Sequence, residues 1–172
     1  MLKPHLANGH KNSVSLSVNE FGTYSLFGSI LLVALTVLSW TDIKSFRLPD
    51  KITLPLIGLG IVQAFLLSDI QASLIGAIIG YLAFVLIEQG FRMLRGKEGL
   101  GRGDAKLLAA GGAWCGWSGL PLIVLIASGT GLLLALLPKY RDQGRIPFGP
   151  CLAFGVFMVW ASSAYVRFTV GS

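Results

Sequence analysis

Long apolar segments alternate with short polar segments along most of the chain. A transmembrane helix needs about 20 apolar residues, so four of the five uncharged segments predict one crossing each. The segment 107–138 is too long for one crossing, and the helix-breaking sequence Ser-Gly-Leu-Pro interrupts it at 118–121. The uncharged segments are 21–41, 52–68, 70–87, 107–138 and 146–166, of which 107–138 is the long one.

The long segment divides into two predicted helices, a short one near Asp104–Trp117 and a longer one near Gly119–Leu137. The sequence therefore predicts an all-α integral membrane protein, a compact polytopic bundle of about six transmembrane helices with a short fourth helix. Residues 1–20 are rich in Ser, Asn and His and predict a flexible polar tail. Residues 21–170 are expected to form one membrane domain.

The composition supports a membrane protein. The 172 residues are 53% hydrophobic and 13% charged, with a mean hydropathy of +0.71, whereas soluble domains carry about 25% charged residues. The net charge of +6 does not indicate a nucleic-acid partner, because the basic residues occupy alternate loops instead of one patch. Those in the first, third and fifth loops are Lys44, Arg47, Lys51, Arg92, Arg95, Lys97, Arg102, Lys106, Lys139, Arg141 and Arg145.

This distribution of charge predicts the orientation in the membrane. The second and fourth loops contain no Lys or Arg, and basic loops face the cytoplasm in most membrane proteins. We therefore expect the first, third and fifth loops inside and both termini outside. Trp40, Trp114 and Trp117 then fall near predicted interfaces, where aromatic side chains are enriched.

Two aspartates stand at the cytoplasmic ends of predicted helices. Asp42 ends the first crossing and Asp104 begins the fourth, so the crossings between them return the chain to the same face. Ionisable residues in such positions are functional candidates. Two carboxylates at one depth suit aspartyl proteolysis, in which they share a proton: the ionised group activates water and the protonated group donates to the scissile carbonyl.

Simpler roles stay open for both aspartates on the residues alone. Asp104 would also stabilise a helix as its N-cap, and Asp42 would also pair with Lys44 or Arg47 near the headgroups. A small proton-coupled transporter and a structural or assembly subunit are the alternatives to a peptidase. Relay carboxylates of a transporter are expected nearer the middle of the membrane.

No metal and no organic cofactor are expected. Cys115 and Cys151 lie within apolar segments and lack the C-x-x-C spacing of zinc or redox sites. Both are predicted to be buried thiols. His5 and His10 are too few for a metal site and belong to the predicted tail.

Two segments resemble the active-site signatures of the type IV prepilin peptidases. The first is DIKSFRLPD at 42–50, and the second is EGLGRGDAKL at 98–107, which contains the G-x-G-D motif also found in presenilin-like intramembrane proteases. The likeness continues through AAGGAWCGW at 109–117 and IPFGP at 146–150. It extends over about residues 25–168.

The resemblance implies that Asp42 and Asp104 are the catalytic pair of a membrane aspartyl endopeptidase. Its substrates and partners would be type IV prepilin or pseudopilin precursors, which carry a short basic leader before an apolar helix and are cut on the cytoplasmic side after a glycine. The protein would cross the bilayer of the bacterial inner membrane several times. The sequence does not indicate an oligomeric state or the pilin system that is served.

The chain departs from many members of that family in one respect. Bifunctional members also methylate the new N-terminus and carry a large cytoplasmic insertion, commonly with paired C-x-x-C motifs. This sequence has no such insertion and only two isolated cysteines. We therefore expect leader cleavage without N-methylation, as in the shorter members of the family.

Four residues near Asp104 are candidates for supporting roles. Gly101 and Gly103 have no side chains and would let another chain approach closely. Lys106 either favours the ionised pair of aspartates or faces the headgroups and sets topology. Glu98 either contacts the basic leader of a substrate or pairs locally with its neighbouring lysine.

Overall fold

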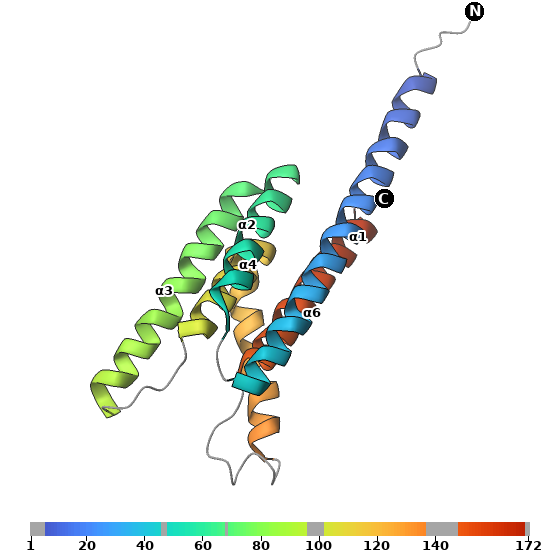
Figure 1. The fold of residues 1–172 in the computed structure, drawn as a ribbon. Coiled ribbons are helices and arrows are strands. Elements are labelled where there is room, and N and C mark those ends of the chain that lie inside the picture. Colours follow the sequence, from blue (N-terminus) through green and yellow to red (C-terminus); the bar gives the residue numbers. More distant parts are fainter. Residues whose placement is uncertain (1–5, 46–47, 68, 96–101, 137–147, 171–172) are drawn as a thin grey trace, which may run out of the picture.

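The computed structural model spans residues 1–172 and describes residues 6–45, 48–67, 69–95, 102–136 and 148–170. Within these ranges every regular element is a helix (Figure 1), which confirms the all-α prediction. Helices are expected here, because only a helix satisfies the backbone hydrogen bonds of a single segment in lipid. They are α1 (Leu6–Ser45), α2 (Asp50–Leu66), α3 (Ile70–Arg95), α4 (Arg102–Leu136) and α6 (Gly149–Val170).

The long helix α4 folds back on itself at Gly116. This glycine has φ 72° and ψ 174°, a backbone conformation outside the helical region that favours a residue without Cβ. A Cβ on Gly111 would lie 3.2 Å from Ile123 Cδ1, whereas a straight helix would separate these residues by about 18 Å. The prediction of about six helices is therefore approximate: the described residues form five, and α4 comprises two helical segments.

The α3–α4 contact brings the two backbones together. A Cβ on Gly76 would collide with the carbonyl oxygen of Gly112, and a Cβ on Gly80 would lie 2.7 Å from the carbonyl oxygen of Leu108. Small residues permit such close packing in membranes, where apolar burial alone does not hold helices together. This contact fixes the N-terminal half of α4 against α3.

The core lies where the second half of α4 and α6 pack on the other helices. Leu31, Leu56, Ile123 and Leu152 are fully buried in it. Trp114 is also buried and donates a hydrogen bond of 2.8 Å from Nε1 to the carbonyl oxygen of Leu56. The prediction that this tryptophan belongs to an interfacial belt is therefore wrong, because its N–H has found a partner inside the bundle.

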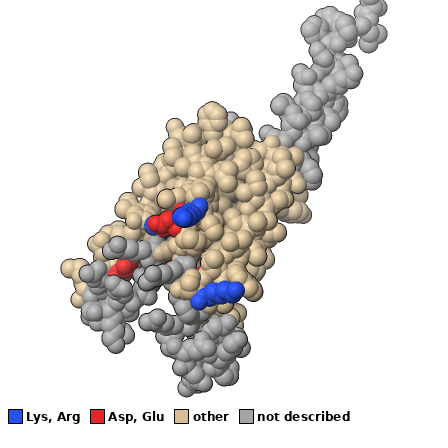
Figure 2. Space-filling model, in the orientation of Figure 1, with Lys and Arg blue, Asp and Glu red and all other residues tan. Residues whose placement is uncertain are grey.

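The outer surface of the bundle is apolar. Figure 2 shows few charged side chains among the described atoms of this face. The helical stretches that are long and apolar enough to cross a membrane are Gly22–Ser45, Ile70–Gly90, Gly103–Leu136 and Gly149–Val166. These features support a multi-pass membrane protein.

The first helix is longer than the first predicted crossing. It begins at Leu6, so it includes most of the residues predicted to form the polar tail. The division of the chain into residues 1–20 and 21–170 stays a prediction.

Candidate active site

The C-terminus of α1 and the N-termini of α2, α4 and α6 meet at one end of the bundle, the lower end in Figure 1. A hydrogen bond joins Asp42 of α1 to Gly149 of α6, and an ion pair joins Asp50 of α2 to Lys106 of α4. The four helix ends are therefore linked side by side, and both predicted catalytic aspartates lie among them.

Asp42 lies in the last turn of α1 and is 5% exposed. Its Oδ2 accepts a hydrogen bond of 3.0 Å from the backbone N–H of Gly149, the first residue of α6. A carboxylate is unfavourable at the C-terminus of its own helix, but the N-terminus of another helix offsets this with its free N–H groups and dipole. The contact orients Asp42 by one of its two oxygens.

The close approach at this point requires glycine. A Cβ on Gly149 would lie 2.6 Å from Asp42 Oδ2 and 2.8 Å from its Cγ, both well inside van der Waals distance. The segment IPFGP was noted for its resemblance, but sequence alone did not indicate that its glycine binds the aspartate. Of this segment, the structure describes Phe148, Gly149 and Pro150.

Asp104 lies in the first turn of α4 and is 8% exposed. The dipole of α4 favours a negative charge there, so stabilisation of the helix start and a catalytic role are compatible. Its neighbours Ala105 and Leu107 are buried in the core. This packing holds the first turn of α4 in place and limits the positions open to the carboxylate.

The first turn of α6 adjoins the candidate site. Cys151 lies in this turn, two residues after Gly149, and is buried. Among the described residues, α1 packs on α2 and α6, and α4 packs on α2, α3 and α6. Asp42 of α1 therefore contacts the turn that contains the predicted buried thiol, and Asp104 begins a helix that also packs on α6.

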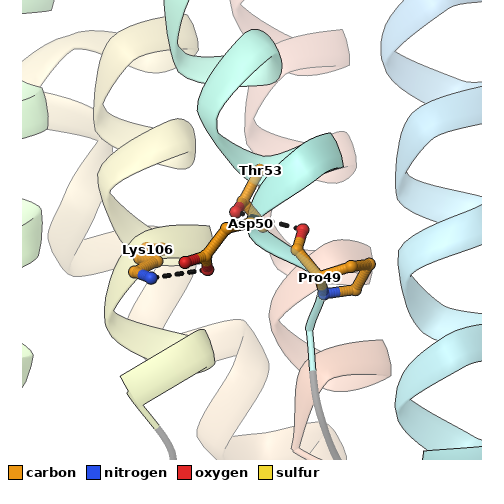
Figure 3. Close-up of polar contacts among 4 residues, drawn as sticks. All are labelled: Pro49, Asp50, Thr53 and Lys106. Atoms are coloured by element: carbon orange, nitrogen blue, oxygen red, sulfur yellow. Dashed lines mark hydrogen bonds and ion pairs between the residues drawn. The ribbon is translucent and has the colours of Figure 1, made fainter.

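Lys106 has a partner that the sequence analysis did not name. Its Nζ lies 2.5 Å from Oδ1 of Asp50 (Figure 3), so it neither stands alone nor simply faces headgroups. The two residues belong to the first turns of α4 and α2. In α2, the hydroxyl of Thr53 also donates to the carbonyl oxygen of Pro49 at 3.4 Å (Figure 3).

The remaining candidates fall in two groups. Gly103 is described, and a Cβ there would lie 3.0 Å from Cβ of Leu48 in the α1–α2 connection. Its open side therefore faces this chain's own backbone in the structure. Gly101 and Glu98 lie outside the described residues. Within the described ranges, no group of three His, Cys, Asp or Glu side chains is arranged to hold a metal ion.

Comparison with known proteins identifies the family. The sequence profile of the type IV leader peptidase family matches residues 29–136, a range that contains Asp42 and Asp104. The chain belongs to the type IV leader peptidase family. The comparison with solved structures found no match.

Several curated relatives are similar over most of this chain. The prepilin leader peptidase/N-methyltransferase of Xanthomonas campestris pv. campestris is 42% identical over 165 residues, covering 88% of this chain and 58% of the relative. The proteins of the same name from Burkholderia pseudomallei and Aeromonas hydrophila are 44% and 38% identical, covering 73% and 88% of this chain. The matched regions make up 42% and 55% of the lengths of these two relatives. The chain thus spans about half the length of these relatives.

Proposed function

We propose that this protein is an aspartyl endopeptidase of the membrane that removes the leader peptide from prepilin-like precursors, with Asp42 and Asp104 as its catalytic pair. The observation that carries the proposal is that the aspartates of both signature segments are buried, in the last turn of α1 and the first turn of α4, at one end of the bundle. Membership of the type IV leader peptidase family and the names of the relatives support the substrate class.

The hydrogen bond from Gly149 suggests different roles for the two oxygens of Asp42. The Gly149 N–H donates to Oδ2 and holds the carboxyl group in one orientation, which leaves Oδ1 as the oxygen that would contact water. In an aspartyl protease one carboxylate takes a proton from that water while the partner carboxyl group donates a proton to the scissile carbonyl. Asp104, at the start of a helix held by the core, is the partner.

The substrate would reach the site from the cytoplasm and the bilayer together. The basic residues next to the aspartates in the sequence favour the cytoplasmic face for this end of the bundle by the positive-inside rule, and the membrane would be the inner membrane of a bacterium. A precursor with a basic leader and an apolar helix would leave its leader at that face and its helix in the lipid. Glu98, Gly101 and Gly103 stay predicted contacts for the incoming chain.

The deciding experiment is cleavage of a co-expressed prepilin precursor by the native chain, Asp42→Asn and Asp104→Asn. Both substitutions keep the shape of the side chain and remove its acid–base chemistry, so we expect rates at least about 10³-fold lower. Membrane insertion and protein level are measured for every variant. Cleavage by either variant at the native rate would make that aspartate structural and contradict the mechanism.

The same experiment tests the expectation about methylation. The mass of the processed product distinguishes a free N-terminus from a methylated one. We expect the unmethylated mass, and a product heavier by one methyl group would contradict the expectation without affecting the peptidase proposal.

A further inference from the structure

A groove opens on the lipid-facing surface beside the candidate active site. It lies between the second segment of α4 and the first turns of α6 and has a volume of about 510 Å³. Its lining is almost wholly apolar, as expected for a surface in contact with hydrocarbon. The lining residues are Thr130, Leu133, Leu134, Pro150, Cys151 and Phe154.

Apolar exposure alone does not distinguish this groove, because lipid covers such surfaces on every membrane protein. The distinguishing feature is its inner end, which Cys151 forms. Cys151 is buried, and it and Pro150 directly follow Gly149, whose N–H contacts Asp42. The groove therefore leads from the lipid-facing surface to the turn of α6 that binds a candidate catalytic carboxylate.

The packing around Cys151 keeps this end of the groove defined. Gly131 of α4 faces the Phe148 ring and the Cys151 sulfur, at 3.3 Å and 3.9 Å from an ideal Cβ. Phe148 in turn lies against Phe84 of α3, with ring centroids 6.3 Å apart. Since these contacts anchor both walls to the bundle, the opening beside Phe154 belongs to the folded structure.

The polar groups of the lining have partners within the bundle. The hydroxyl of Thr130 donates to the carbonyl oxygens of Ile126 and Ala127, at 2.8 Å and 3.0 Å, and it also shares a hydrogen bond with the thiol of Cys151. None of the lining side chains carries a charge. The occupant that fits such a surface is an apolar helix whose own backbone hydrogen bonds are satisfied.

We infer that this groove binds the apolar helix that follows the scissile bond of the precursor, an inference that rests on the proposed function. The helix lies between α4 and α6, and its N-terminal end reaches the candidate catalytic carboxylates. A peptide bond within a helix has its carbonyl oxygen hydrogen-bonded, so the segment at the carboxylates is extended while the helix in the groove stays intact. One continuous site thus binds the helix in the groove and cleaves the peptide bond beside it.

Photo-crosslinking in the Asp42→Asn protein tests the inference, because the precursor is then bound but not consumed. A photoreactive phenylalanine replaces Leu133, which is 67% exposed in the groove. The matched control replaces Leu86 of α3, which is 66% exposed and does not line the groove. We expect an adduct with the apolar segment of the precursor from position 133 and only background from position 86.

Kinetics of the active protein provide the second measurement. Phe154→Ala shortens one wall of the groove at a half-exposed position, so we expect KM for the precursor to rise about tenfold, equivalent to about 1.4 kcal/mol of lost binding, with kcat nearly unchanged. Leu86→Ala is the control and leaves both constants unchanged. A fall in kcat with unchanged KM would contradict a role in binding the helix.

The outcomes separate this inference from the proposed function. Cleavage by the native chain with equal adducts at positions 133 and 86 overturns the groove as the binding site and leaves the peptidase standing. A strong adduct at position 133 without cleavage by the native chain supports the groove and overturns the peptidase. Adducts at position 133 with lipid in place of the precursor assign the groove to lipid and overturn the inference.

Discussion

At Gly149, the first residue of α6 touches the candidate catalytic carboxylate directly. Its N–H donates to Asp42 Oδ2 at 3.0 Å, and the same oxygen lies 2.6 Å from the position that a Cβ would take. Hydrogen bonding and steric fit therefore depend on the same glycine. Asp42 owes its orientation to a residue more than a hundred positions away in the sequence.

Gly149→Ala tests this contact. The added methyl group must displace the carboxyl group of Asp42, and a misplacement of about 1 Å lowers catalysis about 10²-fold. We expect a loss of that size in the rate of precursor cleavage, with insertion and thermal stability close to native. The control is Gly129→Ala in α4, where nothing lies within 4 Å of the new Cβ and cleavage stays native. Equal rates for the two variants would contradict the proposed orientation of Asp42.

At the scale of the elements, the ion pair between Asp50 and Lys106 joins the first turns of α2 and α4 (Figure 3). Both side chains are partly exposed, and such pairs contribute at most about 1 kcal/mol to stability. Its importance lies in its position, because Lys106 follows Asp104 by two residues on the same turn. The pair restrains the part of α4 that presents the second candidate carboxylate.

Exchange of the two charges tests this restraint. Asp50→Asn and Lys106→Met each leave one charge without its partner, and we expect cleavage about tenfold slower with little change in stability. The double variant Asp50→Lys with Lys106→Asp restores the pair in reverse and recovers much of the rate. If the double variant is as slow as the single variants, Lys106 acts by its charge on the active site and not through Asp50.

At the scale of the whole molecule, the described face of the bundle shows few charged side chains (Figure 2). Large apolar side chains such as Leu26, Leu86 and Leu125 are exposed on its surface, which suits contact with lipid. Among the described lysines, Lys44 and Lys106 lie in the same helix turns as Asp42 and Asp104. The orientation of the whole bundle would thus decide from which side a precursor is cut.

Labelling of single introduced cysteines tests that orientation. Gln71 begins α3 at the opposite end from Lys51 of α2, and both side chains are exposed. We expect a membrane-impermeant maleimide to label Gln71→Cys in spheroplasts, and to label Lys51→Cys only after the membrane is opened. The native chain measures the background from Cys115 and Cys151. The reverse pattern would place the aspartates outside and contradict cleavage at the cytoplasmic face.

Much of the fold was predictable because the relevant signals are local. The uncharged segments predicted the helices, since the thickness of the bilayer sets their length. The break in the long segment 107–138 was also predicted, and the structure places it at Gly116, just before the Ser-Gly-Leu-Pro sequence. The number of helices was approximate because the two segments of α4 meet directly at Gly116, with no connecting loop between them.

The partners of the candidate site residues were not predictable in the same way. The simpler role left open for Asp42 was pairing with Lys44 or Arg47, whereas in the structure it accepts a hydrogen bond from Gly149. Lys106 was expected to act on the aspartates or to face headgroups, but it pairs with Asp50. Trp114 was assigned to an interface and is buried. Each of these outcomes depends on which helix lies next to which.

The sequence by itself determined the membrane class, the positions of the apolar helices and the two aspartates that mark the family. These properties follow from short segments, because hydrophobic length, helix breakers and signature motifs act within one stretch of chain. The tertiary structure alone decided that α6 supplies the N–H to Asp42, that α2 holds Lys106 and that a groove leads to Cys151. Contacts between helices in a membrane arise from close packing of complementary surfaces, and no single segment contains that information.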